Sequence, residues 1–461
     1  MKEFKENKII QEIMEIEQIN GLNDIYIDNS IPLWHVLRYR LRGYFFQKNG
    51  ITDISSGKSK KLCINDLKYF FISFFQYIKI LFSNKTVKVC FFGFSRLESI
   101  NGTYIDKFID PIIHESNLND SDYLYFNNQY KRHSEPRSEA HKIIYVDFIN
   151  SLSMLIGALL LPFIYIRNAN AYNKVISITK KYISKKKKVQ LFILLKSASI
   201  YIQKVIYLNL FKGLSPSSIV GVSRVTFVPQ ALAAKQLGIK VIEIQHGITQ
   251  GPTNLYSGYV NRMVDPDIFC TFGDYCPKNV FGIEESNIVN IGWAFKSYIN
   301  SISNVFVKTE NALLVISEPG ISEKLLLFIV SLADKYPQIE FHIRRHPQES
   351  FNEKQLSIIK ESKNIKDVTS TQCSQIAILP YDFIMGENSS VLYESLSMGK
   401  NVARINCCGF NAIGYDFNKD DGFYYINSID SFYGFMHIKS RNSKDTIYSD
   451  FNRELFIKLI S

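Results

Sequence analysis

Two histidines follow hydrophobic segments that are typical of buried β-strands, and the first stands in Gln245-His246-Gly247, directly after the apolar run 239–244. An imidazole has an unperturbed pKa near neutral pH, so a histidine at a strand end can act as a general base. Gly247 allows the backbone to turn sharply at this point. The alternative is a histidine that is held in a turn by hydrogen bonds to the backbone.

The second histidine lies among positive charges. It belongs to Arg344-Arg345-His346-Pro347, which follows the strand-like run 339–343. Pro347 favours an extended conformation of His346 and so directs the imidazole off the strand end. Two guanidinium groups and one imidazole suit a phosphate or a nucleotide diphosphate. The alternative is a group of surface charges on a loop.

Two serines stand where a strand gives way to a helix. Ser389 and Ser390 follow the run 383–385 and open a helical segment at 390–398. Their hydroxyls and the free N–H groups of the first helical turn form an anion site, although either serine could be only an N-cap. Glu394, one turn further on, could accept hydrogen bonds from ribose hydroxyls.

A fourth polar set follows the apolar run 312–316 and consists of Ser317, Glu318 and Gly320, in a turn that is expected to face a cleft. Gly320 is weak support for a phosphate contact, since a plain turn explains it equally well. Neither a GxGxxG fingerprint nor a Walker loop occurs in the sequence, which argues against dinucleotide enzymes and P-loop NTPases.

Strands and helices alternate around these motifs. Residues 218–222, 228–237 and 239–244 have the patterns of a strand, a helix and a strand, and the same rhythm returns after residue 311. This alternation predicts parallel sheets, in which ligands bind at the carboxyl ends of the strands. The predicted fold class is α/β, with two Rossmann-like, doubly wound domains that face a cleft and with extra N-terminal helices.

The chain of 461 residues is long enough for two large cores, and its charge is unevenly distributed. Residues 1–310 carry a net charge of +13 and residues 311–461 carry −2. The asymmetry indicates two parts with different partners, one of them anionic or membrane-bound. The predicted division is an N-terminal helical segment packed on the first domain (1–85), a first Rossmann-like domain (86–303), a second Rossmann-like domain (311–430) and a C-terminal helical tail (431–461).

Two apolar stretches, 69–82 and 152–166, raise the question of membrane contact. Both are shorter than the ~20 apolar residues that a spanning helix needs. They can be buried helices or strands, or they can insert one apolar face into a membrane, where the lysine run 185–188 could touch anionic headgroups. The seven cysteines form no CxxC pair and fit a reducing cytoplasm.

In this order, the motifs resemble those of the two-domain GT-B glycosyltransferases that build bacterial surface polysaccharides. The pairs His346-Pro347 and Ser389-Ser390 resemble those of bacterial polysialyltransferases and capsule Kdo transferases, which use CMP-activated sugars. The sequence Gln245-His246-Gly247, followed by RRHP and Ser-Ser, also resembles CDP-glycerol glycerophosphotransferases. Residues 31–34 and 102–106 resemble the start of uncharacterised surface-polysaccharide transferases.

The resemblance implies an inverting, metal-independent glycosyltransferase (EC 2.4) without a cofactor, acting in the synthesis of capsule, O-antigen or lipopolysaccharide. A sugar of the sialic acid or Kdo type would move from a CMP-activated donor to a polysaccharide or lipid-linked glycan acceptor. The enzyme would be cytoplasmic, with its basic N-terminal half at the inner face of the cell membrane, and no nucleic acid would be a partner. Alternative donors are a CDP-polyol or a UDP-sugar.

Each predicted site residue has a role under this hypothesis. The catalytic residues would be His246, His346 and Asp106, with the base open between His246 and Asp106, since no secure counterpart of the polysialyltransferase acidic motif occurs. The nucleotide sugar would contact Arg345, Pro347, Ser317, Glu318, Gly320, Glu387, Asn388, Ser389, Ser390 and Glu394. The acceptor side would comprise Gln245, Gly247, Thr253 and Asn254.

Two other classes of protein remain open from the sequence. A UDP-sugar epimerase of the same fold would also carry a histidine at a strand end and serines at a helix start, but it would need no acceptor. A membrane-associated assembly protein without enzymatic activity could also be basic and apolar. It would not need His246, His346 and Ser389 to face one cleft.

Overall fold

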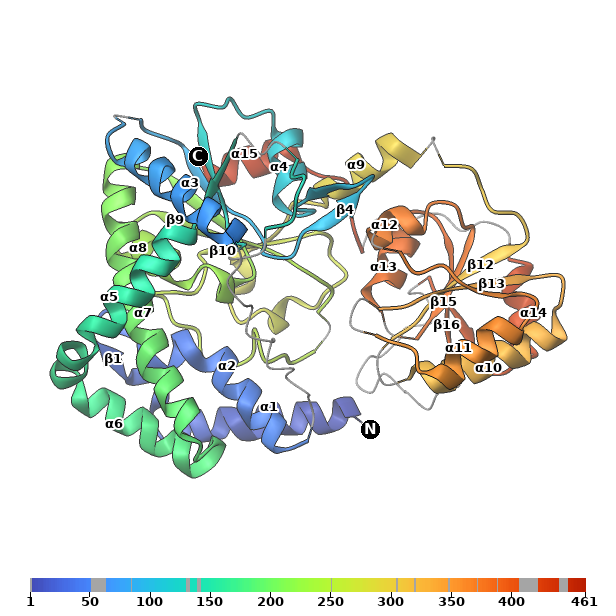
Figure 1. Cartoon of the computed structure of the whole chain (residues 1–461), viewed down its shortest axis with the longest axis horizontal. Coiled ribbons are helices and arrows are strands. Elements are labelled where there is room, and N and C mark those ends of the chain that lie inside the picture. Colours follow the sequence, from blue (N-terminus) through green and yellow to red (C-terminus); the bar gives the residue numbers. More distant parts are fainter. Residues whose placement is uncertain are drawn as a thin grey trace.

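The computed structural model describes residues 2–50, 64–83, 85–129, 133–138, 142–249, 251–303, 306–318, 321–346, 349–370, 372–387, 389–405, 422–438 and 447–461. The predicted site residues Gly320, Pro347 and Asn388 lie outside this set. The described residues form two α/β domains that stand side by side in Figure 1.

The first domain is built on a seven-stranded parallel sheet with the strand order β11-β10-β9-β8-β3-β6-β7. Its strands are β3 (Val89–Phe92), β6 (Tyr123–Asn127), β7 (Ile143–Tyr145), β8 (Ser218–Val222), β9 (Lys240–Ile244), β10 (Ile268–Thr271) and β11 (Ile288–Asn290). β3 is buried along its whole length, because the sheet has helices on both faces, as parallel sheets require.

Side chains of β3 alternate between two cores. Cys90 and Phe92 pack toward α7 (Lys187–Leu214) and α8 (Val228–Gln236), whereas Val89 and Phe91 pack toward the opposite layer. That layer contains α4 (Ile109–Ser116), α9 (Ala294–Ser303) and α15 (Arg453–Ile460). Consecutive residues of β3 are therefore apolar because helices cover both faces of the sheet.

The second domain is a six-stranded parallel sheet with the order β14-β13-β12-β15-β16-β17. Its strands are β12 (Ala312–Ile316), β13 (Glu340–Arg344), β14 (Ile365–Asp367), β15 (Phe383–Gly386), β16 (Asn401–Ile405) and β17 (Tyr424–Ile426). The helices are α10 (Ser322–Lys335), α11 (Glu353–Glu361), α12 (Ser374–Ala377), α13 (Ser390–Ser397) and α14 (Ser431–Met436). The predicted fold class of two Rossmann-like domains is confirmed.

The C-terminal segment differs from the single tail expected for 431–461. α14 belongs to the second domain, where Phe432 and Phe435 are fully buried in its core. α15 instead returns to the first domain, where Ser218 donates its hydroxyl hydrogen to the carbonyl of Ile460 at 2.9 Å. Figure 1 shows this last helix beside α4. The chain therefore crosses between the domains twice.

A hairpin of the first domain reaches the second. It consists of β4 (Glu98–Ile100) and β5 (Thr103–Ile105), which pair antiparallel. Ser99 forms a bridge with Gln372, and its carbonyl accepts a hydrogen bond from the N–H of Cys373 at 2.9 Å. The hairpin thus fixes one side of the space between the two sheets.

Long helices cover the outer side of the first domain. They are α1 (Lys2–Ile19), α2 (Leu33–Lys48), α3 (Ile64–Leu81), α5 (Asp147–Arg167) and α6 (Ala169–Ile178), joined to α7 by a π-helical turn at Thr179–Ile183. Shorter elements are β1 (Tyr26–Ile27), β2 (Ile31–Pro32) and 3₁₀ turns at Leu22–Asp24, Arg224–Thr226, Lys278–Val280 and Glu285–Asn287. By length and composition, α5 and α7 are apolar enough to cross a membrane, although half of the most apolar part of α7 is buried.

Helix α2 is tied to the loop that continues from His246. Arg42 is fully buried and pairs with both carboxylate oxygens of Glu17 at 2.6 and 2.7 Å. The same guanidinium donates to the carbonyls of Asn254 and Ser257 at 3.2 and 2.7 Å. Arg38, one turn earlier, donates to the carbonyl of Tyr259 at 2.6 Å. This pair of arginines therefore holds the loop through its backbone.

We expect Arg42→Ala to lower the free energy of unfolding by about 3–5 kcal/mol, because Glu17 would keep a buried charge without its partner. The urea midpoint of the first domain measures this loss, and the double variant with Glu17→Ala should regain part of it. Arg40→Ala on the same helix, where Arg40 lies over the ring of Tyr44, should cost less than about 1 kcal/mol. An unchanged midpoint for Arg42→Ala would contradict the expectation.

Candidate functional site

Arg96 lies near both predicted histidines. It follows β3 in the first domain and is exposed. Its positive charge lowers the pKa of His246, which follows β9 of the same domain, and also that of His346, which follows β13 of the second domain. Such an effect falls off quickly with distance. Contacts agree with this placement: the ring of Phe94 after β3 lies beside that of His246, and Gln372, which bridges Ser99 of the hairpin, accepts a hydrogen bond from Arg344 at the end of β13. The ends of β3, β9 and β13 therefore lie in one region.

His246 is kept neutral by its surroundings. Burial, followed by the charges of Arg96 and Lys107, lowers its pKa to about 4. Its Nδ1 lies 3.2 Å from the hydroxyl of Tyr256, and its ring stands beside Phe94 with 6.2 Å between the centroids. In the tautomer whose Nδ1–H donates to the Tyr256 oxygen, Nε2 carries a lone pair and can accept a proton from a substrate.

The predicted acceptor-side residues bond mostly within the protein. Gln245 is buried; its amide donates to the carbonyl of Gly247 at 2.8 Å and accepts from the N–H of Phe272 at 2.8 Å. The hydroxyl of Thr253 accepts from the N–H of Tyr256, and the side chain of Asn254 donates to the carbonyl of Tyr39. Gln245, Thr253 and Asn254 therefore shape the loop after His246 and attach it to the rest of the domain.

In the second domain, Glu349 links the ends of two strands. Its carboxylate accepts from the hydroxyl of Ser317 after β12 at 2.7 Å and from the N–H of His346 after β13 at 3.0 Å. Its charge raises the pKa of His346, but burial outweighs it and the pKa is lowered overall. Ser317 is thus committed to this carboxylate, while Glu318 beside it is half-buried.

Arg345, which was predicted to contact a phosphate, is engaged by other side chains of the second domain. Its guanidinium pairs with Asp367 at 3.0 Å, bonds to the hydroxyl of Thr369 and lies over the ring of Phe351. Asp367 already neutralises this positive charge. Arg344 is also anchored, through the hydroxyl of Ser370 and the carbonyl of Gln372.

Helix α13 begins where the two serines were expected to start it. Ser389 is the N-cap, and its hydroxyl accepts from the N–H of Val391 at 3.4 Å. Capping leaves other N–H groups of the first turn without a partner inside the helix, so the cap and an anion site are compatible. Glu387 before it is buried, and its carbonyl accepts from Arg404 at 2.9 Å.

Glu394 is buried on α13 rather than open to a ribose, which corrects the predicted contact in this conformation. Gln375 donates to its Oε2 at 2.5 Å, and Lys107 of the first domain lies 3.9 Å from its Oε1. Burial raises the pKa of Glu394, while Lys107 opposes that change. Lys107 also pairs with Glu98 at 3.6 Å. These charges join the two domains.

Asp106 is fully buried, which corrects its predicted role as the alternative base. Its oxygens accept from the N–H groups of Phe94 and Phe108 at 2.5 and 2.9 Å and from the hydroxyl of Tyr125 at 3.3 Å. Burial raises its pKa to about 6, but no acceptor hydroxyl can reach an oxygen surrounded in this way. Asp106 therefore shapes the turn after β3.

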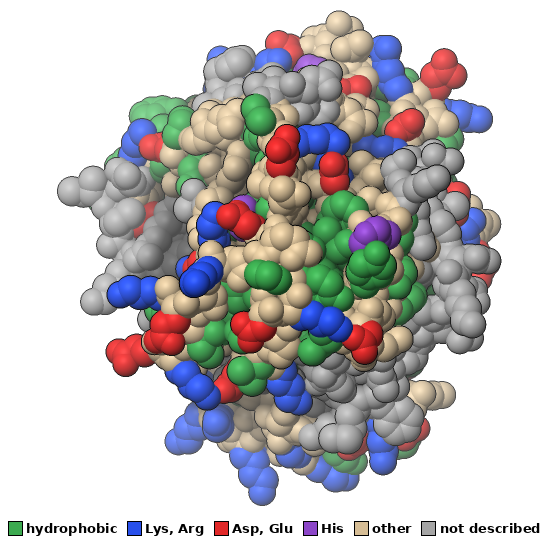
Figure 2. All heavy atoms as spheres, turned by 90° about the vertical axis from the view of Figure 1, so that its right-hand side faces the viewer, with side chains coloured by type: hydrophobic (Ala, Val, Ile, Leu, Met, Phe, Trp, Pro, Cys, Tyr) green, Lys and Arg blue, Asp and Glu red, His purple; other side chains and the backbone are tan. Residues whose placement is uncertain are grey.

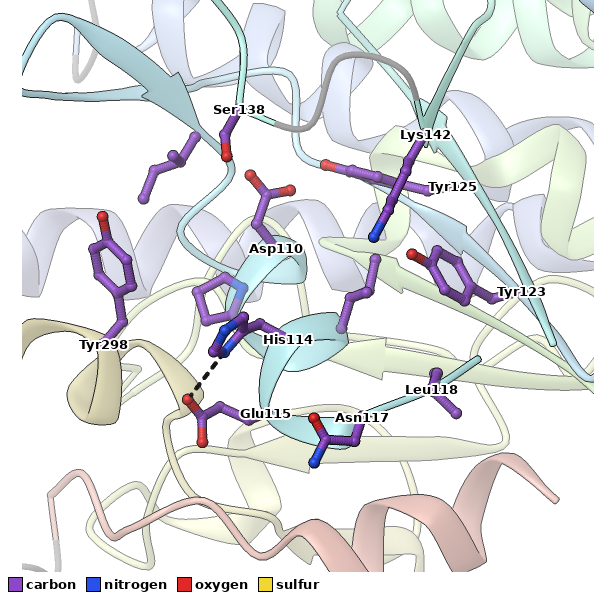
Figure 3. Close-up of a pocket in the computed structure, with 13 residues that line it drawn as sticks. Asp110, His114, Glu115, Asn117, Leu118, Tyr123, Tyr125, Ser138, Lys142 and Tyr298 are labelled. Carbon is purple, nitrogen blue, oxygen red and sulfur yellow. Dashed lines mark hydrogen bonds and ion pairs between the residues drawn. The ribbon is translucent and has the colours of Figure 1, made fainter. Parts of the chain in front are cut away.

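A cavity of about 300 Å³ lies beside α4, whose residues Asp110 and His114 line it. Figure 3 shows Asp110, Tyr123, Tyr125 and Lys142 around it. Asp110 pairs with Arg137 through both oxygens, at 2.6 and 2.9 Å. None of the predicted catalytic or nucleotide-binding residues lines this cavity, so it is separate from the cleft between the domains.

Three residues of the site were missing from the predicted set, namely Arg96, Lys107 and Glu349. Arg96 follows a predicted strand, so the rule that selected the other motifs could have found it. Lys107 carries no local signal, since it joins the domains through Glu394, which is distant in the sequence. Glu349 bonds to the N–H of nearby His346, but its bond to Ser317 spans 32 residues and has no local signal. Among the described residues, no group of three or more His, Cys, Asp or Glu side chains is arranged to hold a metal ion.

No family model and no curated protein matches this chain. Its structure is similar to the UDP-GlcNAc 2-epimerase from Neisseria meningitidis, with 12% sequence identity, 81% of this chain and 99% of that chain covered, and a TM-score of 0.49. It is similar to the UDP-GlcNAc 2-epimerase from Methanocaldococcus jannaschii in complex with UDP-GlcNAc and UDP, with the same identity and coverage and a TM-score of 0.44. It is also similar to MurG from Acinetobacter baumannii (13%, 57% and 71%, 0.30).

These likenesses are too distant to bear on what this chain binds or does. The order of its own strands defines two parallel, doubly wound α/β domains.

We expect Arg96→Gln to raise the pKa of His246 toward its usual value of 6.5, because one nearby positive charge is removed. Titration of ¹³C-labelled histidines by NMR measures the change, with His246→Asn used to assign the signal. Arg262→Gln is the matched control, since Arg262 is almost fully exposed and pairs with Glu284. If His246 titrates identically in Arg96→Gln and the wild type, the two side chains are not neighbours in solution.

Proposed function

We propose that this protein is an enzyme that acts on a nucleotide-activated sugar in the cleft between its two domains. The observation that carries the proposal is the convergence of His246, His346 and Arg96 from three strand ends. A neutral imidazole, a second imidazole and a guanidinium without an ion pair among the described residues supply a base and positive charge at one place. In sugar transfer, the base takes the proton of the attacking hydroxyl, and the positive charge stabilises the departing nucleotide phosphate.

The second domain would hold the nucleotide. Its phosphate would lie against the first turn of α13, where Ser389 and Ser390 add hydroxyls to the N–H groups. His346 would approach the phosphate from the neighbouring loop, which Glu349 keeps in place. Arg96, rather than Arg345, would supply the positive charge that stabilises the leaving phosphate, because Arg345 is neutralised by Asp367.

In a transfer reaction, Nε2 of His246 would take the proton of the acceptor hydroxyl. The oxygen would form a bond to the anomeric carbon as the bond from that carbon to the phosphate oxygen breaks. The phosphate would leave with the electron pair, beside Arg96 and His346. A CMP-activated donor of the sialic acid or Kdo type, or a CDP-polyol, is proposed on the motif resemblance alone.

Epimerisation of a UDP-sugar is the second candidate, and it is the reaction named for the Neisseria and Methanocaldococcus proteins. It would use the same nucleotide site and the same imidazoles without an acceptor. Gln245, Thr253 and Asn254 form hydrogen bonds within the protein. They therefore leave few polar groups to bind the acceptor that a transferase requires. For this reason, UDP-sugar epimerisation stands as a second candidate reaction next to sugar transfer.

A nucleotide should stabilise the protein against heat. We expect one of CMP, CDP, UDP or GDP to raise the midpoint of thermal unfolding, since a ligand at 100 times its Kd contributes about 2.7 kcal/mol. Ser389→Ala combined with Ser390→Ala should reduce the shift, whereas Ser331→Ala, on the exposed side of α10, should not. If none of the four nucleotides shifts the midpoint, the proposed nucleotide site is wrong.

His246→Gln should lower turnover by about 10²–10⁴-fold, because the group that moves a proton is lost. Chromatography of the nucleotide sugar, with and without a glycan acceptor, measures turnover and separates transfer from epimerisation. His114→Gln is the control, since His114 is 78% exposed on α4. Near-normal turnover by His246→Gln would remove this histidine from the reaction.

A further inference from the structure

Helix α5 exposes an apolar face along most of its length. Leu155, Leu159, Phe163 and Ile166 recur every three or four residues, and between 61% and 73% of each side chain is exposed. Met154 and Leu160 widen this face. Scattered apolar residues are ordinary on a protein surface, but a continuous face of this kind marks a contact with something apolar.

The opposite face of α5 is fixed to the protein. Gly157 packs so closely on α7 that an added Cβ would lie 2.9 Å from the backbone of Ser199. Gln203 of α7 donates to the side chains of Asn150 and Ser153 at 3.1 and 3.0 Å. Because α5 lies along α7 in this way, it is held flat against the domain. A bilayer could meet only its outer face.

The segment around this face is rich in basic residues, although Asp28 pairs with Arg167 at the end of α5 at 2.7 Å. Residues 148–242 contain fourteen Lys or Arg residues and no Asp or Glu residue. Lys185, Lys186, Lys187 and Lys188 are all exposed at the start of α7, beyond the C-terminal end of α5. In contrast, acidic and basic side chains are mixed on the outer face of the second domain (Figure 2). Positive charge beside an apolar face complements a bilayer with anionic headgroups.

We propose that the outer face of α5 inserts into one leaflet of a membrane that contains anionic lipids, with Lys185–Lys188 on the headgroups. The protein would lie on the membrane without crossing it.

Neighbouring elements extend this surface. α3 packs against α5 and carries its own exposed stripe of Leu67, Phe71 and Phe75, each spaced by four residues. A cavity of about 620 Å³ opens beside α5, with Met154, Ala158 and Leu195 among its apolar lining residues and Asn150, Ser199 and Gln203 among its polar ones.

Flotation of the full chain with lipid vesicles tests the proposal and needs no nucleotide or sugar, so its outcome is independent of the proposed function. We expect the wild type to float with vesicles of phosphatidylcholine and phosphatidylglycerol and to bind less as salt rises. Leu159→Glu combined with Phe163→Glu should reduce binding at least about tenfold, because two charges would enter the apolar layer. Replacing Lys185–Lys188 by Gln should weaken binding and remove its salt dependence.

Leu327→Glu on α10 is the matched control, because Leu327 is equally apolar and 50% exposed but lies on the second domain. It should bind vesicles as the wild type does, and circular dichroism should show the same fold for all variants. If the wild type does not bind these vesicles, or if the α5 variant binds them as well as the wild type does, the proposal is overturned. A change of the α5 variant in oligomeric state alone would assign the face to a second copy of the chain.

Discussion

Parallel pairing of the strands constrains where chemistry can occur in this protein. In each sheet the strands end at one edge, so every loop that follows a strand is collected there. The hairpin of β4 and β5 reaches from one such edge to the other domain. The ammonium group of Lys107 lies between the carboxylates of Glu98 and Glu394 and so links the domains. Arg96, His246 and His346 become neighbours because of this arrangement, although they are far apart in the sequence.

Buried charged side chains in the first domain hold the loop that follows His246. Arg224 pairs with Glu243 at 2.8 Å, and His35 of α2 pairs with Asp265 at 3.0 Å. Burial lowers the pKa of His35. Burial would raise the pKa of Asp265, but its contact with His35 and the charges of Arg224 and Arg38 lower it overall. Together with Arg42, these pairs fix the segment after His246 to α2. Buried ion pairs contribute little net stability, and their effect here is to specify one conformation of the loop.

Polar side chains near the cleft divide into those that shape it and those that face it. Asp106, Gln245 and Ser317 are buried and bonded, so they determine the turns on which the histidines stand. Arg96 is exposed and the histidines are half-buried, so these three remain accessible to a ligand. A polar residue that follows a strand can therefore either shape the turn or face the ligand.

The sequence by itself determined the α/β class, the two parallel sheets and the start of α13 at Ser390. These features depend on apolar runs, turn residues and caps, which act over a few neighbouring residues. Tertiary structure alone decided that Arg345 pairs with Asp367, that Asp106 and Glu394 are buried and that α15 returns to the first domain. Ion pairing, burial and domain contact join residues far apart in the chain, and no local pattern records which partner a charged side chain will meet.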